Sequence, residues 1–448
     1  MTMHASLPGN PPLRIGLAGL GTVGASVLKI LRRRENALAA RCGRAIRVTG
    51  VSARDRTRDR GVDLDGLAWF EDPVALATSP EIDCFVELIG GSDGPAKAAV
   101  EAALKAGKHV ITANKALLAA HGVALAEIAE SKGVALAFEA SSAGGIPIVK
   151  TLREALAGND VSRISGILNG TCNYILSRME LEGLTFEACL KDAQRLGYAE
   201  ADPTFDVEGF DTAHKLSILT SLAFGTKIDA EAIHVEGISS ITPLDLRMAD
   251  ELGYRIKLLG VAERTKTGIE QRVQPTMVPK ASPIAQLMGV LNAVSVDADA
   301  VREITLVGPG AGGDPTASAV VADLADVARG TAGLPFGLPV ARLEEARRAP
   351  MQRHEGGYYV RLAVADRPGA AAAIATRMAE ADISLESIVQ RRSPEAATRD
   401  PGGRSGAPVP VVLITYATTE AAIRAALEKV TADGHVAEPP QVIRIERE

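Results

Sequence analysis

The feature that most constrains the fold is a glycine-rich turn between an apolar segment and a helical one near the start of the chain. Gly19, Gly21 and Gly24 form a GxGxxG pattern after the apolar run at 13–18, and residues 23–34 have helical spacing. In a strand–turn–helix unit the first glycine permits the tight turn, the second lets the backbone approach a pyrophosphate, and the third lets the helix pack on the strand. The unpaired N–H groups at the helix start attract phosphates. The pattern therefore favours a dinucleotide site over a glycine-tightened turn that binds nothing.

Strand-like and helix-like segments alternate through the first third of the chain. The segments 46–53, 83–91 and 109–112 are apolar and strand-like, whereas 96–107 and 117–133 have helical spacing. Strands that alternate with helices of this length predict a parallel sheet covered by helices on both faces. We therefore expect an α/β first domain of Rossmann type.

Two further domains are expected after the first. The middle of the chain mixes helical and strand-like segments, which is typical of an α+β domain. From Gly356 on, six segments follow in βαββαβ order, which fits a ferredoxin-like domain, and 391–409 is expected to be a long mobile loop between its middle strands. The predicted boundaries are 1–147 with a returning segment at 303–335 for the first domain, 148–302 for the second, 336–355 for a linker and 356–448 for the third.

Charge and composition exclude several classes of function. The 49 basic residues are outnumbered by 55 acidic ones, whereas nucleic-acid binding needs concentrated positive charge. No run of about 18 apolar residues is present, so no membrane span is expected, and residues 1–12 do not resemble a signal peptide. The four cysteines form no CxxC pair, which indicates reduced core thiols of a cytoplasmic protein.

Arg54 and Asp55 follow the predicted second strand, where this type of fold contacts the ribose of its cofactor. An acidic residue there favours the ribose hydroxyls of NAD, and an arginine accommodates the 2′-phosphate of NADP. Arg54 favours NADP, with NAD as the alternative. Both side chains could instead lie in water on a surface loop.

The segment 197–215 concentrates carboxylates and ends in a lysine. Asp211 and Lys215 are four residues apart, so they share a face if this stretch is helical. They directly precede a long apolar stretch, which favours a partly buried helix start and a lysine that donates a proton. The alternative is a surface ion pair, worth only ~0.3–0.5 kcal/mol.

Two other polar groups stand next to or within apolar runs. Lys115 follows a short strand at its carboxyl end, the edge at which open α/β sheets bind ligands. The alternative for Lys115 is a helix start in solvent. Asn169, Thr171 and Asn173 lie inside an apolar run and need partners. The alternative is a strand-to-helix transition that Asn173 or Thr171 caps.

The chain resembles homoserine dehydrogenase in its longer bacterial form with a C-terminal ACT domain. The supporting strings, in the family's order between Ile15 and Gln390, are GLGTVG, VELIGG, GKHVITANKALL, EASSAGGIPI, ILNGTCNYIL, GYAEADPTFDVEGFDTAHK, GPGAGGDPTASAVVADL and DRPG. SSAGG departs from the family's more frequent run of three glycines before IPI, and the loop after Gln390 is a second departure. The resemblance implies interconversion of L-homoserine and L-aspartate 4-semialdehyde with NAD(P)(H), a step toward threonine and methionine. It also implies that the second domain binds substrate and dimerises.

The same resemblance implies roles for individual residues. Lys215 would be the catalytic acid/base, and Lys115 would lie where nicotinamide and substrate meet. Glu200 and Asp211 would hold the substrate ammonium and orient the lysines, with support from Asp206. The implied cofactor contacts are Gly19, Gly21, Thr22, Val23, Gly24, Arg54, Ser92, Lys115, Gly197 and Gly313. Some family members bind a sodium ion, mostly through backbone carbonyls, and the matching positions are Glu139, Ser142, Gly144 and Ile146.

The ACT resemblance implies regulation by an amino acid, with L-threonine as the favoured effector, in a homo-oligomer. Assistance to dimerisation alone is the alternative for this domain. Two other functions stay open on the sequence. One is a non-catalytic NADP-binding sensor, which predicts loss of the lysines although Lys115 and Lys215 are present. The other is a dehydrogenase of a different amino-acid aldehyde.

Overall fold

The N-terminal part of the chain folds around a six-stranded parallel sheet. The computed structural model describes residues 10–350, 355–365, 367–390 and 408–446. The strand order is β3-β2-β1-β4-β5-β6, and every neighbouring pair is parallel. The strands are β1 (Leu13–Ala18), β2 (Ile46–Ser52), β3 (Ala68–Phe70), β4 (Cys84–Glu87), β5 (His109–Thr112) and β6 (Leu136–Ala137). The crossover at β1, where the chain order reverses, is the place at which such sheets bind nucleotides.

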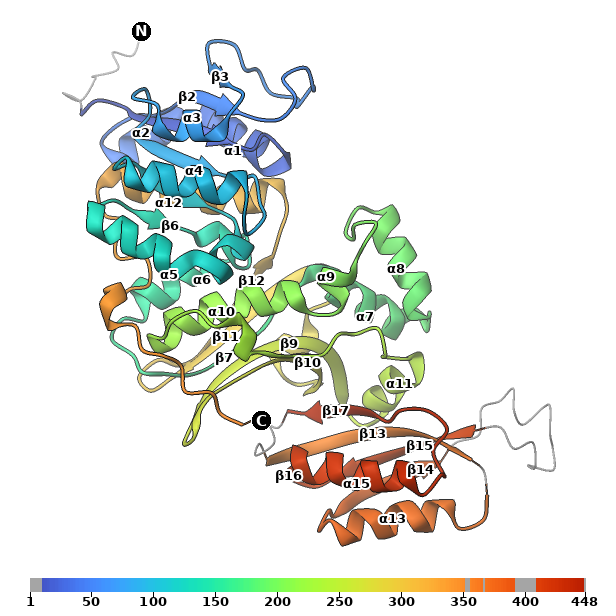
Figure 1. The fold of residues 1–448 in the computed structure, drawn as a ribbon. Coiled ribbons are helices and arrows are strands. Elements are labelled where there is room, and N and C mark those ends of the chain that lie inside the picture. Colours follow the sequence, from blue (N-terminus) through green and yellow to red (C-terminus); the bar gives the residue numbers. More distant parts are fainter. Residues whose placement is uncertain (1–9, 351–354, 366, 391–407, 447–448) are drawn as a thin grey trace.

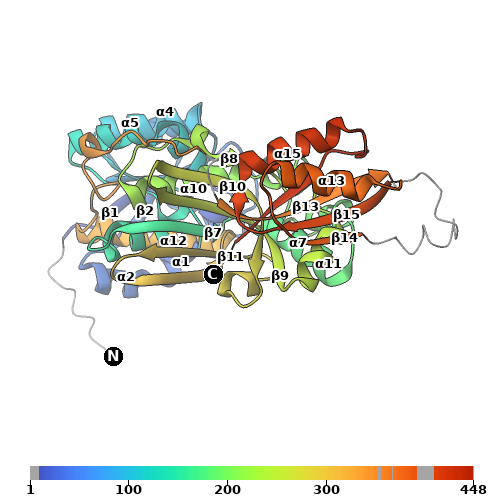
Figure 2. The ribbon, with the colours of Figure 1, turned by 90° about the horizontal axis from the view of Figure 1, so that it is seen from below.

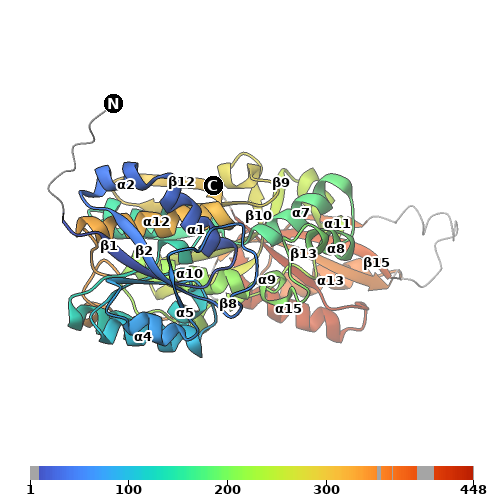
Figure 3. The same ribbon diagram turned by 90° about the horizontal axis from the view of Figure 1, so that it is seen from above.

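Helices cover both faces of this sheet, as the alternating pattern predicts. One face packs against α1, α2 and α12, and the other against α3, α4 and α5 (Figure 3). The two layers exist because the strands are apolar on both sides, and each side needs its own cover. The helices are α1 (Thr22–Arg33), α2 (Glu35–Cys42), α3 (Pro73–Thr78), α4 (Pro95–Lys105), α5 (Lys115–Lys132) and α12 (Gly313–Arg329).

The middle of the chain forms an antiparallel sheet with helices packed on it. The order β12-β11-β7-β9-β10 is antiparallel throughout, and β8 adds to β10. Its strands are β7 (Val161–Ile167), β8 (His234–Val235), β9 (Tyr254–Thr265), β10 (Gly268–Pro279), β11 (Leu291–Ala298) and β12 (Arg302–Pro309). Its helical elements are α6 (Ile148–Lys150), η2 (Thr151–Ala155), α7 (Gly170–Glu182), α8 (Phe186–Arg195), α9 (Thr204–Val207), α10 (Phe210–Phe224), η3 (Ala230–Ala232), α11 (Pro243–Glu251) and η4 (Pro283–Gln286). Two short turns contact the first domain: η1 (Glu139–Ser141) lies against α12 and β5, and η5 (Val340–Arg342) lies against α5.

Helix α10 lies between the two sheets and contacts both parts of the chain. It packs on β7 and β9 on one side and on α5 on the other (Figure 1). Almost all of its residues are buried, so its polar side chains need partners inside the protein. This position brings the start of α10 close to the carboxyl edge of the parallel sheet.

The C-terminal part has the predicted ferredoxin-like order. Alternate residues of its first strand, such as Val360, Leu362 and Val364, are buried in a separate core beneath two helices. The elements are β13 (Glu355–Ala365), α13 (Ala370–Glu380), β14 (Leu385–Gln390), β15 (Pro408–Thr415), β16 (Thr418–Thr419), α15 (Glu420–Ala432) and β17 (Gln441–Ile445). The three-part α/β architecture predicted from the sequence is therefore confirmed.

The C-terminal sheet is joined to the middle sheet rather than separate from it. Strand β17 pairs in parallel with β10 through Thr276 and Arg444, so the order continues as β10-β17-β13-β15-β14 (Figure 2). At this junction Glu270 accepts hydrogen bonds from Arg272 (2.5 Å) and Arg444 (2.9 Å), and all three side chains are buried. The two parts therefore share one continuous sheet and a buried ion cluster.

The segment predicted to return to the first domain is divided between two parts of the fold. Helix α12 does pack against α1, but β12 forms a hairpin with β11 in the middle sheet, which corrects the prediction for the strand. The short connection at 299–301 explains the difference, because consecutive antiparallel strands pair locally. The predicted linker packs on the protein through the buried Phe336, whose ring lies 5.6 Å from that of Phe138.

Of the predicted long loop, residues 391–407 lie outside the described residues. In the part of the chain that is described, each helix is too short or too polar to span a bilayer.

Candidate active site

The glycine turn has the geometry that a bound pyrophosphate requires. Gly19 has φ +99°, and a Cβ there would lie 2.3 Å from the carbonyl oxygen of Leu88. A Cβ on Gly24 would lie 2.1 Å from the carbonyl oxygen of Gly19, so α1 packs against the turn only because this residue is glycine. Gly21 caps α1 without a side-chain hydrogen bond and faces open space. The first amides of α1, at Thr22 and Val23, are thus at the helix end that attracts phosphate.

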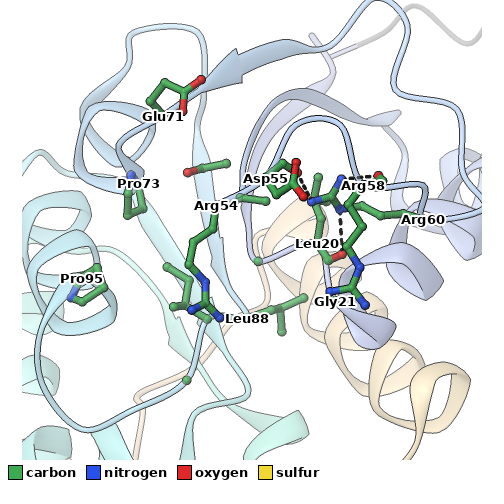
Figure 4. A pocket seen from close by; sticks show the side chains of 15 residues that line it. Leu20, Gly21, Arg54, Asp55, Arg58, Arg60, Glu71, Pro73, Leu88 and Pro95 are labelled. Atoms are coloured by element: carbon green, nitrogen blue, oxygen red, sulfur yellow. Dashed lines mark hydrogen bonds between the residues drawn. The ribbon is translucent and has the colours of Figure 1, made fainter.

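A cavity of about 510 Å³ extends from this turn along the carboxyl ends of β2 and β4. Its rim carries Arg54, Arg58 and Arg60, and Figure 4 shows the Arg54 side chain directed toward Leu88 inside the cavity. Arg60 donates from Nε to the carbonyl oxygen of Leu20 (3.1 Å), which ties this basic loop to the glycine turn. A basic rim beside a phosphate-binding turn suits a cofactor with an additional phosphate.

Asp55, the residue after Arg54, is engaged locally. Its Oδ1 accepts hydrogen bonds from the backbone N–H (2.8 Å) and the hydroxyl (2.7 Å) of Thr57. The side-chain hydrogen bond from Thr57, above all, lowers the pKa of Asp55. Both hydrogen bonds fall on Oδ1, so they fix the orientation of the carboxylate beside Arg54.

The loop after β4 is held by a buried carboxylate. Glu87 is fully buried and accepts from the N–H groups of Ile89 (2.7 Å) and Gly90 (2.9 Å) and from the hydroxyl of Thr112. These bonds fix the loop that lines the cavity and tie it to the end of β5. Ser92 follows in the same loop and donates to Asp93 (2.9 Å).

Two other predicted cofactor residues lie away from the glycine turn in sequence. A Cβ on Gly313 would lie 2.8 Å from the hydroxyl of Ser26, so this glycine lets α12 begin against the first turns of α1. Gly197 has φ +76° in the turn after α8, at the start of the segment that leads to Glu200.

The centre of the site is a carboxylate that holds two lysines. Asp211 is 3% exposed at the start of α10, and its Oδ2 lies 2.7 Å from Nζ of Lys215. Its Oδ1 lies 2.8 Å from Nζ of Lys115, which comes from the first residue of α5. Helical spacing makes the first contact, whereas the second joins the parallel-sheet domain to the middle domain. The alternatives of a surface ion pair and of a lysine in solvent are wrong, since Asp211 and Lys215 are buried and Lys115 is partly buried.

The ionisation of this cluster follows from its geometry. Burial alone would raise the pKa of Asp211, but Lys215 and Lys115 outweigh it and hold that pKa well below its usual range. Burial alone would lower the pKa of Lys115, but Asp211, Asp206 and Glu200 more than compensate and raise it. Both charges therefore persist at neutral pH, and Lys115 keeps its proton.

Asn169 completes the cluster. Its Nδ2 donates to Asp211 (2.8 Å) and to Asp206 (2.8 Å), while its Oδ1 accepts from the N–H of Cys172 and caps α7. The cap expected from Asn173 or Thr171 is made by Asn169 instead, because Asn169 is the last residue before α7 begins, and Asn169 in addition bridges two carboxylates. Sequence reasoning singled out this asparagine as a polar residue that needs partners, but did not place it among the site residues.

The two remaining predicted carboxylates, Asp206 and Glu200, differ in how far they are exposed to solvent. Asp206 is half-buried, and burial followed by the charge of Asp211 raises its pKa. Glu200 is exposed in the loop between α8 and α9, which Gln194 holds by a hydrogen bond to the Glu200 carbonyl oxygen (3.1 Å).

Lys215 has a second partner besides Asp211. Its Nζ donates to the carbonyl oxygen of Leu168 (2.8 Å), a backbone contact that no sequence pattern predicts.

In the segment proposed to bind sodium, the only predicted carboxylate, that of Glu139, is already used by backbone N–H groups. The carboxylate of Glu139 accepts from the N–H groups of Val149 (3.0 Å) and Lys150 (2.8 Å), and burial raises its pKa to about 7. The hydroxyl of Ser142 is buried without a hydrogen-bond partner among the described residues. Within that same part of the chain, no three His, Cys, Asp or Glu side chains gather as metal ligands, so a cation here would depend on backbone carbonyls.

Comparisons with known proteins point to one family over nearly the whole chain. The family models that match are "Homoserine dehydrogenase, NAD binding domain" at 19–139, "Homoserine dehydrogenase" at 147–325 and "ACT domain" at 358–431. Homoserine dehydrogenase of Neisseria gonorrhoeae is 42% identical over 97% of this chain and 99% of its own, and that of Pseudomonas aeruginosa is 44% identical over the same shares. The crystal structure of a homoserine dehydrogenase from Thiobacillus denitrificans is 45% identical and superposes with a TM-score of 0.89 over 97% of this chain and 98% of that one.

Proposed function

Because the chain belongs to the homoserine dehydrogenase family, we propose that Lys215, Lys115 and Asp211 are the residues that carry its reaction. The enzyme is an oxidoreductase that acts on a CH–OH group and uses a nicotinamide cofactor. The observation that carries our proposal is the Asp211 carboxylate, which holds both lysine ammonium groups at 2.7 and 2.8 Å. These three residues come from two domains and meet at the carboxyl edge of the parallel sheet, next to the nucleotide cavity.

Lys215 is the proton donor in this proposal. A bound reduced nicotinamide supplies the hydride that is added to the aldehyde carbon of L-aspartate 4-semialdehyde. The aldehyde oxygen then carries negative charge, which an adjacent ammonium stabilises and protonates to give the hydroxyl of L-homoserine. The Leu168 carbonyl and Asp211 aim Nζ of Lys215, and the partly buried Lys115 adds a second positive charge.

The substrate carries an ammonium of its own, which needs a carboxylate. Both oxygens of Asp211 already contact lysines, so we assign to it chiefly the orientation of Lys115 and Lys215. Glu200 and Asp206 then supply the contact to the ammonium. Their charges act on Lys115, which supports a position beside it.

We propose NADP as the preferred cofactor. Arg54 lines the cavity at the end of β2, with Arg58 and Arg60 beside it, whereas Asp55 is held by Thr57. The arginine side chains at this edge of the cavity favour an additional phosphate.

A sodium ion would be held by the segment from Glu139 to Ile146. The unpartnered buried hydroxyl of Ser142 fits an oxygen-ligated cation there, and the carboxylate of Glu139 is already used by two N–H groups. Backbone carbonyls of Glu139, Ser142, Gly144 and Ile146 would therefore be the ligands, and the ion would stabilise this turn without taking part in the reaction.

The ACT domain supports regulation by a small molecule, for which we propose L-threonine as a feedback effector. In this proposal the reaction is a step toward threonine and methionine, so threonine is an end product whose accumulation would inhibit the enzyme. Pairing of ACT domains supports a homo-oligomer. The free thiols of Cys42, Cys84, Cys172 and Cys189 support a cytoplasmic location.

The proposed reaction is tested by following NADPH oxidation spectrophotometrically with the purified protein and L-aspartate 4-semialdehyde. We expect turnover with this aldehyde, and more efficient turnover with NADPH than with NADH. Absence of turnover with either cofactor would refute the proposed chemistry, and a preference for NADH would refute the cofactor assignment alone.

A further inference from the structure

The side chain of Asn169 uses both of its polar atoms inside the site. The residue is 5% exposed and lies between the end of β7 and the start of α7. Its Oδ1 accepts from the N–H of Cys172 (2.8 Å), and its Nδ2 donates to Asp206 (2.8 Å) and to Asp211 (2.8 Å). The opposite orientation of the amide is excluded, because it would place Oδ1 against two carboxylates and Nδ2 against an N–H group.

The two carboxylates differ in what else holds them. Asp211 also contacts the two lysine ammonium groups at 2.7 and 2.8 Å. Among the residues that the structure describes, Asn169 is the only hydrogen-bond donor to the Asp206 side chain. The main chain of Asp206 is held from the same helix, since Sγ of Cys172 lies 3.2 Å from its carbonyl oxygen. The start of α7 therefore fixes both the place of Asp206 and the direction of its carboxylate.

We propose that Asn169 is a positioning residue that directs the Asp206 carboxylate toward the ammonium of the substrate, while Asp211 stays with the two lysines. This inference deepens the proposed function and rests on the role given there to Asp206. It explains how two neighbouring carboxylates act on different cations, because a neutral amide that contacts both holds each in its own place.

The charges around Asp206 explain why a donor is needed there. The titratable groups that face it are Cys172 of α7, Asp211 and Lys215 of α10, and Lys115 of α5. Burial raises the pKa of Asp206 and the negative charge of Asp211 raises it further, whereas the hydrogen bond from Asn169 and the two lysines lower it. Burial raises the pKa of the Cys172 thiol, which stays neutral. Loss of Nδ2 would therefore let Asp206 bind a proton at higher pH and lose its charge.

Capping of α7 does not by itself require an asparagine. Serine and aspartate cap helices about as well as asparagine, because each has a side-chain oxygen that accepts from the free N–H groups of the first turn. Neither has a side-chain nitrogen that could donate to two carboxylates. Replacement of Asn169 by serine or aspartate therefore separates its two contributions, since the cap is kept and the bonds to Asp206 and Asp211 are lost.

The test is the steady-state reduction of L-aspartate 4-semialdehyde with NADPH as a function of pH, in the full-length wild type, Asn169→Ser and Asn169→Asp. Asn173→Ser is the matched control. Asn173 is buried on the same helix, and its Nδ2 donates to the carbonyl oxygens of Leu287 (3.3 Å) and Leu291 (3.2 Å), outside the cluster. Thermal unfolding of each variant checks that it folds.

We expect Asn169→Ser to raise KM for the aldehyde by roughly 10-fold or more, the range for loss of a hydrogen bond to a charged group. Its kcat should fall by a smaller factor, because both lysines remain on Asp211. The acidic limb of kcat/KM should move to higher pH, and further in Asn169→Asp, which adds a third carboxylate. Asn173→Ser should keep the KM and the acidic limb of the wild type.

The inference would be overturned if both Asn169 variants matched Asn173→Ser in KM and in the acidic limb, since Asn169 would then only cap α7. A fall of kcat larger than the rise of KM would also overturn it, because Asn169 would then act through Asp211. If Asn169→Ser does not fold, Asn169→Asp decides by the same readouts. Wild-type turnover in the same assay tests the proposed reaction separately, so an active wild type with unaffected Asn169 variants refutes this inference alone.

Discussion

Replacement of Lys215 by alanine should nearly abolish turnover while the cofactor still binds. The substitution removes the side chain that contacts both Asp211 and the Leu168 carbonyl, and it leaves Lys115 paired with Asp211. Loss of a positioned proton donor typically slows a reaction by about 10²–10⁴-fold. That factor equals an increase of about 2.7–5.4 kcal/mol in the activation free energy, at about 1.36 kcal/mol per factor of ten.

The assay is steady-state oxidation of NADPH with L-aspartate 4-semialdehyde, combined with a fluorescence titration of NADPH. We expect the dissociation constant for NADPH to change by less than about threefold, since Lys215 lies outside the nucleotide cavity. Lys132→Ala is the matched control, because Lys132 is an exposed lysine at the far end of α5 from Lys115. Added methylamine should partly restore the turnover of Lys215→Ala by entering the space that the side chain leaves.

The reasoning would be refuted by a folded Lys215→Ala variant that keeps more than about a third of the wild-type kcat, a loss far below the range expected for a missing proton donor. It would also be refuted if the NADPH dissociation constant rose in parallel with the loss of kcat. That result would make Lys215 a cofactor-binding residue rather than an acid.

Three further predictions follow from other contacts. Asp211→Asn removes the charge that holds the pKa of Lys115 above its usual value, so the alkaline limb of the kcat profile for aldehyde reduction should move to lower pH; an unmoved limb would contradict the assigned role. Arg54→Ala should raise KM for NADPH much more than KM for NADH, and equal changes would show that Arg54 does not contact the 2′-phosphate. Burial lowers the pKa of Lys257 to about 8 from 10.5, so the folded state binds fewer protons than the unfolded one between these values. The unfolding free energy of the wild type relative to Lys257→Met should therefore rise with pH across this window, in pH-dependent denaturant titrations, and a flat difference would contradict the burial argument.

The sequence alone was sufficient for features that depend on neighbouring residues. Gly19 and Gly24 could be assigned to a strand–helix turn from the GxGxxG pattern between an apolar segment and a helical one. The pairing of Asp211 with Lys215 follows from helical geometry. Likewise, the alternation along β13 was enough to predict one buried face of the C-terminal sheet. The family itself was identified from strings of residues along the chain, and the comparisons confirm it.

Contacts between distant segments were decided only by the tertiary structure. No local pattern indicates that Lys115 reaches Asp211 or that Asn169 bridges Asp211 and Asp206. The strand of the returning segment was misplaced for the same reason, since pairing of β12 with β11 competes with packing on the first domain.

The junction of the C-terminal domain shows the difference most clearly. Periodicity marks β17 as a strand, but it says nothing about which edge the strand joins. In the fold, β17 pairs with β10 and places Arg444 beside Glu270. A chain that ends near Pro350 would therefore expose the edge of β10 and leave Glu270 and Arg272 without Arg444. Truncation would thus change stability as well as regulation, whereas point substitutions in the C-terminal domain can test regulation alone. Steric limits on a turn and the periodicity of a helix or strand depend on adjacent residues, so the sequence shows them directly. The choice of a partner strand depends on which distant apolar surfaces are buried against each other, and only the tertiary structure shows that.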